Sequence, residues 1–244
     1  QIIVPFMAVI YVVAALVLII ANIENVPGAF VEIFEGAFGV KPVAGGVLAS
    51  IAIAMQKGVA RGIFSNESGL GSAPIAAAAA QTKEPVRQGL VSMTGTFIDT
   101  IIICTMTGLS IVMMGTWADK SLEGVQVTTA AWQKGLYFLP GDVASFILMI
   151  CLVFFAFTTI LGWNYYGERC LEYLFNGSKG AVKVYRWLYI LAVFIGPYMT
   201  VAAVWTIADI FNGLMAIPNI IALFALGGVV AKDTREYLKK NKEL

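Results

Sequence analysis

The sequence predicts an all-α integral membrane protein, a bundle of six membrane-spanning helices of which one is broken. Composition is the first reason: 59% of the 244 residues are apolar and only 13% are charged, whereas soluble domains carry roughly 45–50% apolar and about 25% charged residues. The second reason is that several stretches of about 20 residues carry almost no charge, which is the length that a helix needs to cross a bilayer. The predicted surroundings are therefore lipid.

Charge and residue usage exclude several classes of function. The chain has 16 Lys and Arg against 15 Asp and Glu, and no basic run before its last dozen residues, so no nucleic-acid partner is expected. It has no histidine, which excludes Ser-His-Asp or Cys-His catalysis and histidine-built zinc sites. Its three cysteines form no C-x-x-C pair and are interpreted as apolar packing residues. We expect neither an enzyme nor a bound cofactor.

Five spans follow from the hydropathy pattern, at residues 2–21, 88–118, 143–167, 187–208 and 210–231. Asp99 is the only charged residue in these five stretches. Few residues, near Trp205 and Asp209, separate the last two spans, which predicts a tight helical hairpin over 187–231. The chain enters its first span at Ile2 without an initiator Met or a signal peptide, so we expect it to be part of a longer protein.

The sixth span, roughly 46–80, is irregular. It contains Lys57, Arg61 and Glu67, and residues 62–74 are rich in Gly, Ser, Asn and Pro. Such a segment does not form a regular helix, and non-helical backbone at membrane depth is tolerated only where protein buries it or where it lines a cavity. The sequence therefore predicts a helix that is broken at 62–72 and faces the interior of the bundle. A plain glycine-rich kink is the alternative.

Basic residues predict the orientation of the spans. With six crossings, both ends of the chain lie on one side, and the tail 232–244 is basic, which makes that side cytoplasmic. The segments 81–88 and 168–186 then also lie inside, and with the tail they hold 11 of the 16 Lys and Arg residues. Segment 22–45 would lie outside, either as an amphipathic cover, since residues such as Glu24, Phe30 and Phe34 recur at near-helical intervals, or as an ordinary loop.

The break itself predicts a binding site. We expect the half-helix before it to end near Phe64, with free carbonyls and the negative end of its dipole. The half-helix after it should begin near Ser72 or Ala73, with Ser72 as N-cap, Pro74 in the first turn and helix-forming residues over 75–80. Carbonyls suit a cation or an ammonium group, and free N–H groups suit a carboxylate. Discontinuous helices of this kind form the substrate and ion sites of many secondary transporters.

Residues 61–81, Arg-Gly-Ile-Phe-Ser-Asn-Glu-Ser-Gly-Leu-Gly-Ser-Ala-Pro-Ile-Ala-Ala-Ala-Ala-Ala-Gln, resemble the signature region of the alanine/glycine:cation symporter family. Looser matches follow at 95–100 and 158–169, so nearly the whole chain is similar to the C-terminal half of such a protein. The resemblance implies a LeuT-type inverted-repeat fold. Residues 1–21 would be the last helix of the first repeat, 46–231 the second five-helix repeat, and the rest of the first repeat would lie in a missing N-terminal half of the same transporter.

The resemblance also implies an activity, the sodium-coupled symport of alanine or glycine by alternating access in the cell membrane. The residues expected to line the substrate pocket are Phe64, Ser65, Asn66, Glu67, Ser68, Gly69, Thr159 and Trp163. For Glu67 the alternative is that it holds the opened backbone, since a carboxylate at mid-membrane is usually paired or functional. Trp163 is equally well explained as ordinary packing.

A sodium site is expected on the span 143–167. Thr158 and Thr159 lie three and four residues after Phe155, so one helix face offers two hydroxyls and the Phe155 carbonyl. Neutral oxygen ligands suit a hard ion such as sodium, but threonines also bond the carbonyls of their own helix. Only the resemblance favours the sodium site. Asp99 either neutralises a second cation or a proton near the broken helix, or is a structural partner of Arg61 or Lys57.

Two other classes remain open. Without the resemblance, the sequence does not separate sodium from proton coupling. A channel would need a continuous polar pore, and one broken helix gives no ring of carbonyls or charges.

The last hairpin contains residues that permit a kink and a gate: Asp209, Asn212, Gly213, Pro218 and Asn219. Gly196 and Pro197 are interpreted in the same way in the preceding span.

Overall fold

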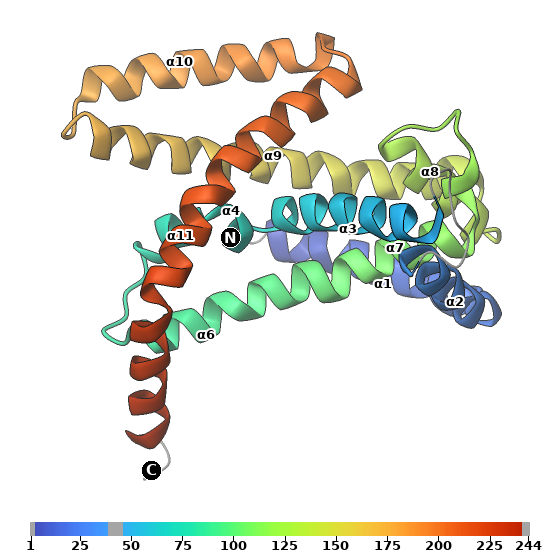
Figure 1. Cartoon of the computed structure of the whole chain (residues 1–244). Coiled ribbons are helices and arrows are strands. Elements are labelled where there is room, and N and C mark those ends of the chain that lie inside the picture. Colours follow the sequence, from blue (N-terminus) through green and yellow to red (C-terminus); the bar gives the residue numbers. More distant parts are fainter. Residues whose placement is uncertain (1–2, 39–45, 241–244) are drawn as a thin grey trace. The chain divides into compact units, whose positions relative to one another are not determined.

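The computed structural model describes residues 3–38 and 46–240, and within these ranges every regular element is a helix (Figure 1). The all-α prediction is therefore confirmed for the described part of the chain. The α-helices are α1 (Ile3–Ala21), α2 (Val26–Ala37), α3 (Gly46–Ser65), α4 (Glu67–Leu70), α5 (Ala73–Ala77), α6 (Pro85–Thr96), α7 (Cys104–Met113), α8 (Val125–Gly135), α9 (Gly141–Leu174), α10 (Lys179–Ile195) and α11 (Val201–Lys240). Between them lie the 3-10 turns η1 (Ile23–Asn25), η3 (Thr116–Ala118) and η4 (Gly196–Tyr198), and the π-helix η2 (Phe97–Ile103).

Three helical segments of the described residues are long and apolar enough to cross a membrane: Pro85–Met113, Gly141–Leu174 and Val201–Lys240. A fourth crossing results if Pro5–Ala21 and Ile23–Ala37, which are bent by 79° relative to each other, form one span. The sequence predicts six. The predicted and the observed numbers of spans differ because of two helices. Helix α3 carries the charged residues Lys57 and Arg61, and α10 is only 17 residues long, which is short for a crossing.

The predicted span 187–208 and the turn near Trp205 and Asp209 are wrong. The chain turns earlier, because α10 ends at Ile195 and η4 follows at Gly196–Tyr198. Proline has no N–H for a helix bond and glycine gives little support to a helix, so Gly196 and Pro197 end the helix there. Helix α11 then runs without interruption from Val201 to Lys240, through Trp205 and Asp209.

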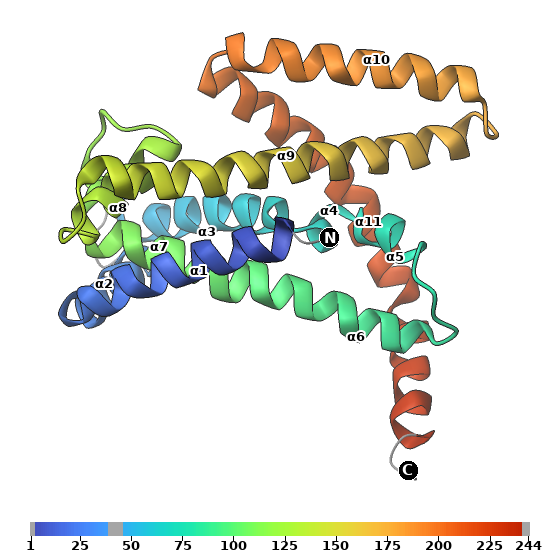
Figure 2. The ribbon, with the colours of Figure 1, turned by 180° about the vertical axis from the view of Figure 1, so that it is seen from behind.

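The chain divides into two compact units, which are described separately. The first consists of Gln1–Gly58 and Ile101–Asn164. In it α1 packs against α7 and α8, as can be followed in Figure 2. Its core is one apolar cluster contributed by α1, α7, the α8 region and the first half of α9: Met7, Tyr11, Ala15, Leu18, Met106, Trp132, Leu136, Ala144, Leu148 and Cys151. The α9 members recur at intervals of three or four residues, so one face of that helix supplies them.

Close approach between α1 and α8 depends on a glycine. A Cβ atom on Gly135 would lie 2.6 Å from Cγ of Leu18, so no larger residue fits without a shift. The Asn22 amide stabilises the same contact, because its Nδ2 donates to the carbonyls of Leu18 and Gly135, both at 2.8 Å.

Helix α2 packs against α7, and Ala29 is the buried residue of α2. The phenylalanines Phe30, Phe34 and Phe38 remain exposed, and residues 39–45 of the predicted connection 22–45 lie outside the described residues.

The second unit consists of Val59–Thr100 and Tyr165–Leu244. Here α11 packs against α4 and α6, and α5 packs against both α4 and α6. Helix α10 returns alongside the last turns of α9 (Figure 1), where Arg186 donates to both oxygens of Glu168 at 2.6 and 2.7 Å. Glu168 is buried, so this pairing compensates for its removal from water. The interrupted segment 62–77 belongs to this unit.

Candidate functional site

The helix that begins at Gly46 is interrupted after Ser65. Asn66 has an extended backbone, with φ −145° and ψ 160°, and the four-residue helix α4 follows from Glu67 to Leu70. Gly71 then takes a left-handed conformation with φ 78°, which glycine adopts at no steric cost. Helix α5 begins at Ala73 and ends at Ala77, three residues before the predicted end of its helical run. The break therefore has a helical turn of its own between the two half-helices.

Asn66 is the residue that organises this turn. Its Oδ1 accepts hydrogen bonds from the backbone N–H groups of Ser68 and Gly69, at 3.1 and 3.2 Å, and so caps α4. Its Nδ2 donates to Oγ1 of Thr100 at 3.1 Å. Both polar atoms of the side chain are thus bonded within the protein. The Ser72 hydroxyl, in contrast, makes no capping bond to α5 and is buried without a partner among the described residues.

A row of side-chain hydrogen bonds joins the break to the α6–η2 helix. Ser65 donates to Oδ2 of Asp99 at 3.0 Å, and the hydroxyls of Ser68 and Thr96 lie 3.1 Å apart. Together with the bond from Asn66 to Thr100, these contacts follow one face of the opposite helix. That helix changes to π geometry over Phe97–Ile103, and short π segments are frequent at functional sites.

The break also requires a glycine at position 69. A Cβ atom there would lie 2.5 Å from the carbonyl oxygen of Ile63 and 2.9 Å from its Cα. Backbone atoms of α3 cannot yield as a flexible side chain would. Gly69 therefore lets α4 turn back against the last turn of α3, and any side chain at this position would displace the segment.

On another side, the end of α3 contacts α11. Arg61 donates to both carboxylate oxygens of Asp209, at 2.8 and 3.3 Å, and its guanidinium lies 4.2 Å from the ring centroid of Trp205. The ring of Phe64 meets Trp205 edge to face, with centroids 5.7 Å apart. Arg61 is therefore paired with Asp209 rather than with Asp99, which corrects the predicted alternative of an Asp99–Arg61 pair.

Further along α11, Asn219 reaches the backbone of α4. Its Nδ2 donates to the carbonyls of Ser68 and Gly69, at 2.9 and 3.0 Å. These two carbonyls end a helix of only four residues, so they have no partner further along that helix. The contact places a side chain of α11 directly on the segment that the sequence predicts as the substrate site.

The predicted sodium ligands lie on α9 in the first unit. The Thr158 hydroxyl donates to the carbonyls of Phe154 and Phe155, both at 3.0 Å. Thr158 is half-buried and Thr159 is exposed. The carbonyl of Phe155 and the hydroxyl of Thr158 thus lie together on the helix face that the sequence predicts, and each is engaged with the other. Trp163 is half-buried one turn beyond Thr159.

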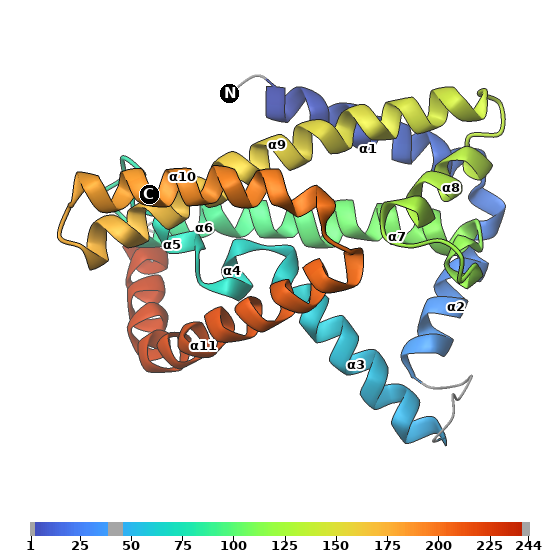
Figure 3. The ribbon, with the colours of Figure 1, turned by 90° about the horizontal axis from the view of Figure 1, so that it is seen from above.

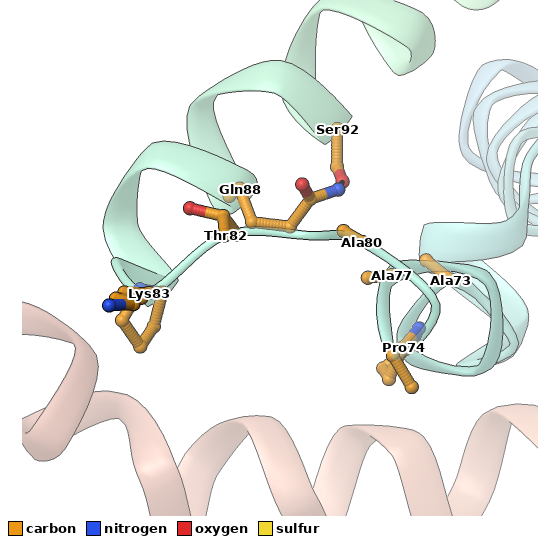
Figure 4. Close-up of a pocket in the computed structure, with 11 residues that line it drawn as sticks. Ala73, Pro74, Ala77, Ala80, Thr82, Lys83, Gln88 and Ser92 are labelled. Carbon is orange, nitrogen blue, oxygen red and sulfur yellow. Dashed lines mark hydrogen bonds between the residues drawn. The ribbon is translucent and has the colours of Figure 1, made fainter.

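A cavity of about 530 Å³ lies between α5, the 78–84 loop and the start of α6 (Figure 4). Its walls are mainly alanine and proline, with Lys83 toward one end and a hydrogen-bonded pair, Gln88 and Ser92, at the other. None of the predicted substrate or sodium residues lines it. In the described residues no group of three or more Cys, Asp or Glu side chains is arranged to hold a metal ion.

Comparison with known proteins decides the family. A family model described as the sodium:alanine symporter family matches residues 1–244. The chain belongs to this family. It is 54% identical over 243 residues to an uncharacterized transporter of Haemophilus influenzae and 48% identical over 246 residues to the sodium/alanine symporter AgcS of Methanococcus maripaludis. Each match covers 99% of this chain and 52% of the relative.

A more distant relative is named for a different amino acid. The probable sodium/glutamine symporter GlnT of Bacillus subtilis is 40% identical over 240 residues, which is 98% of this chain and 48% of that protein. The chain thus spans about half the length of the curated relatives that it matches. The family is one of transporters, and three helical segments of the described residues are long and apolar enough to span a membrane, which agrees with the predictions of a membrane protein and of no enzyme.

In this chain of the sodium:alanine symporter family, the predicted site residues fall into two groups. Phe64 to Gly69 and Asp99 belong to the second unit, and the Ser65–Asp99 hydrogen bond connects them. Phe155, Thr158, Thr159 and Trp163 belong to the first unit. That the two groups bind one substrate and one ion stays a prediction.

Sequence reasoning missed the partners of the break. Thr100 and Trp205 have no predicted role at the site, and Asn219 and Asp209 are predicted only to permit a kink or a turn. A polar residue within an apolar span was the available signal, because such residues usually face protein rather than lipid. The residues that Asp209 and Asn219 contact lie about 150 positions earlier in the sequence, and the partner of Thr100 lies 34 positions earlier, so no local pattern reveals these pairings.

Proposed function

We propose that the protein is a secondary active transporter that couples the entry of sodium to the uptake of a small neutral amino acid, alanine or glycine, by alternating access. The observation that carries this proposal is the family match over the whole chain, with its signature segment at the interrupted helix. A discontinuous helix supplies backbone groups that bind a zwitterion. Since the chain spans half of its relatives, the missing N-terminal half would provide the rest of a LeuT-type bundle.

The break is proposed as the substrate site, with the following assignment of roles. The side chains of Ser65, Asn66 and Ser68 are bonded to Asp99, Thr100 and Thr96, so they hold the backbone of the break in shape. The backbone at the end of α3 would receive the ammonium group, because the last carbonyls of a helix attract a cation. Phe64 would form an apolar lid, and Thr159 with Trp163 would complete the wall.

The coupling ion is proposed to be sodium, held by Phe155, Thr158 and Thr159. Thr158 currently donates its hydroxyl hydrogen to the helix carbonyls, and the lone pairs on the same oxygen remain suited to a hard cation. Asp99 would balance a second cation. One charge that crosses 100 mV contributes about 2.3 kcal/mol, enough for roughly fiftyfold accumulation before the ion gradient is counted.

Orientation and location are part of the same proposal. The basic residues of the 81–88 and 168–186 segments and of the tail support a cytoplasmic location for these segments, by the positive-inside rule. The protein would then be a multi-pass protein of the cell membrane with a cytoplasmic C-terminus.

Uptake of labelled alanine into proteoliposomes tests the function. The full-length carrier is reconstituted, and uptake is measured with an inward sodium gradient, with potassium in its place, and with an inward proton gradient alone. Sodium-dependent accumulation that glycine competes away is expected. Accumulation driven by protons alone would replace sodium coupling, and accumulation of glutamine but not alanine would change the substrate.

The sodium ligands have their own test. Replacing both Thr158 and Thr159 with alanine should raise the sodium concentration that half-saturates uptake, because two hydroxyl ligands are lost. Thr94→Ala is a matched control, since Thr94 also bonds a carbonyl of its own helix, that of Val91 at 2.7 Å, and is no predicted ligand. An unchanged sodium response in the double variant would remove α9 from the proposed ion site.

A further inference from the structure

The carbonyl end of α4 is the part of the break that needs a partner from elsewhere. Inside α4, the Glu67 carbonyl accepts from the N–H groups of Gly71 and Ser72, which closes the turn. The next two carbonyls, of Ser68 and Gly69, are instead bonded by Nδ2 of Asn219. At membrane depth, a backbone carbonyl without a hydrogen-bond partner is costly. The α4 turn is therefore completed by a side chain that lies 150 residues further along the chain.

The Asn219 side chain also lies close to Gly71, the residue that follows α4. A Cβ atom on Gly71 would lie 2.9 Å from Cβ, Cγ and Oδ1 of Asn219. Gly71 also has φ 78°, a conformation that residues with a side chain rarely adopt. The glycine thus serves two purposes: it forms the left-handed turn, and it leaves the space that the Asn219 side chain occupies.

Asn219 also follows the proline of α11. Pro218 lies inside this 40-residue helix and has no N–H for the carbonyl of Leu214. Figure 3 shows that α11 changes direction part-way along its length. Any change in the bend at Pro218 would move the adjacent Asn219, and with it the two carbonyls that Asn219 holds.

We propose that Asn219 is a positioning residue for the transported substrate: by binding the Ser68 and Gly69 carbonyls it fixes the α4 turn, and it couples the bend of α11 to the shape of the substrate site. This inference rests on the proposed function for the identity of the substrate. It also assigns different roles to the backbone carbonyls of the break. Those of Ser68 and Gly69 each accept a hydrogen bond from Asn219, and the carbonyls at the end of α3 are where the ammonium group is expected to bind.

Three variants of the full-length carrier separate this role from simple packing. Asn219→Ala removes the donor and the side chain. Asn219→Asp keeps the size and shape, but an ionised carboxylate has no hydrogen to donate to the two carbonyls. Asn212→Ala is the matched control, since Asn212 lies on the same helix two turns earlier and has no hydrogen-bond partner for its Nδ2 among the described residues.

The first measurement is hydrogen exchange of ligand-free protein, read by mass spectrometry on peptides that cover residues 66–72. Both Asn219 variants should exchange about tenfold faster there, because losing the two hydrogen bonds from Asn219 loosens the turn that protects these amides. Asn212→Ala should leave these peptides unchanged. Unchanged exchange in all three variants would overturn the positioning role whether or not the protein binds alanine.

The second measurement is sodium-dependent alanine binding and uptake. Both Asn219 variants should raise the KM for alanine about tenfold, with a smaller effect on kcat, because the site is displaced before the substrate binds. In Asn219→Asp the affinity should recover as the pH falls, since the protonated acid regains one donor. If Asn219 only fills space, Asn219→Asp should have nearly the same KM for alanine as the unmodified carrier at every pH. That result would contradict the proposal.

A double-mutant cycle with Gly71 completes the test. Gly71→Ala alone should be severe, because its new Cβ meets Asn219, and Gly71→Ala should cost less in the Asn219→Ala background, where Cγ and Oδ1 are gone. Strict additivity would contradict the interlock. If the unmodified carrier binds no alanine while hydrogen exchange responds as expected, the proposed substrate is wrong and the positioning of α4 stands.

Discussion

In the first unit, Tyr11 and Trp132 are at most 5% exposed and lie in an apolar cluster supplied by α1, α7, α8 and α9. In the second unit, the break is surrounded by hydrogen bonds and one ion pair, and Leu70 is its one fully buried apolar side chain among the described residues 62–72. Both units are built from apolar helices, so hydropathy does not distinguish them. They differ in what holds the helices together.

This difference bears on the proposed mechanism of alternating access. Apolar packing is dense and barely compressible, so its side chains do not shift without opening voids or causing clashes. Hydrogen bonds between side chains and backbone can be exchanged for others of similar strength, including those to a substrate. The first unit has the properties of a scaffold, and the second has those of a region that changes shape.

The largest effect is expected in the apolar cluster. Trp132→Ala should lower the free energy of unfolding by about 3–5 kcal/mol, because it leaves a large cavity beside Tyr11, whose ring centroid is 5.3 Å away. Unfolding by SDS in detergent micelles measures this loss. Trp132→Phe should be mild, since Nε1 of Trp132 has no partner among the described residues. Equal losses in both variants would contradict the cavity as the cause, because phenylalanine fills much of the volume of the indole.

The next effect is expected at the cap of α4. Asn66→Ala should cost about 2 kcal/mol, because it removes a helix cap and the hydrogen bond to Thr100. Unlike Trp132→Ala, it should also weaken alanine binding in the protein that remains folded. Asn66→Asp retains the acceptor for both N–H groups and should keep most of the stability. If Asn66→Ala lowered stability without changing the affinity for alanine, the break would be structural only.

The position of this break was predictable, and its partners were not. Glycine, asparagine, serine and proline within 62–74 disfavour one continuous helix, and the chain is interrupted at Asn66 and again at Gly71 and Ser72, so local chemistry was sufficient to predict a break. Asp209 gave the opposite result: as a charge between two apolar stretches it predicted a turn, but Arg61 neutralises it and α11 continues. The outcome depended on a residue 148 positions away. The turn instead formed at Gly196 and Pro197, which the sequence had indicated only as a weak point.

The Arg61–Asp209 ion pair should contribute less than the cap. Its side chains are 41% and 46% exposed, so a coupling of about 0.5–1 kcal/mol is expected from a double-mutant cycle with alanine at each position. Reversing both charges, Arg61→Asp with Asp209→Arg, should recover part of the loss seen in either single reversal. Failure to recover would mean that the stacking of Arg61 on Trp205, rather than the charge pair, holds the two helices.

The smallest effect is expected at a polar contact of the first unit, outside the spans. Hydrogen bonds from the side chain and backbone of Ser121 to Asp119, at 2.6 and 2.9 Å, lower the pKa of this carboxyl below its ordinary value. A lowered pKa means that the contact stabilises the fold above the ordinary Asp value of about 4, and that this stabilisation is lost as the pH falls through the folded value. Thermal unfolding between pH 3 and pH 6 should therefore show a small deficit for Ser121→Ala at the upper end that disappears at the lower end. In an Asp119→Asn background the deficit should no longer depend on pH. Because this contact is fully exposed, a pH effect as large as that of Asn66→Ala would contradict the division between a packed unit and one held by polar contacts.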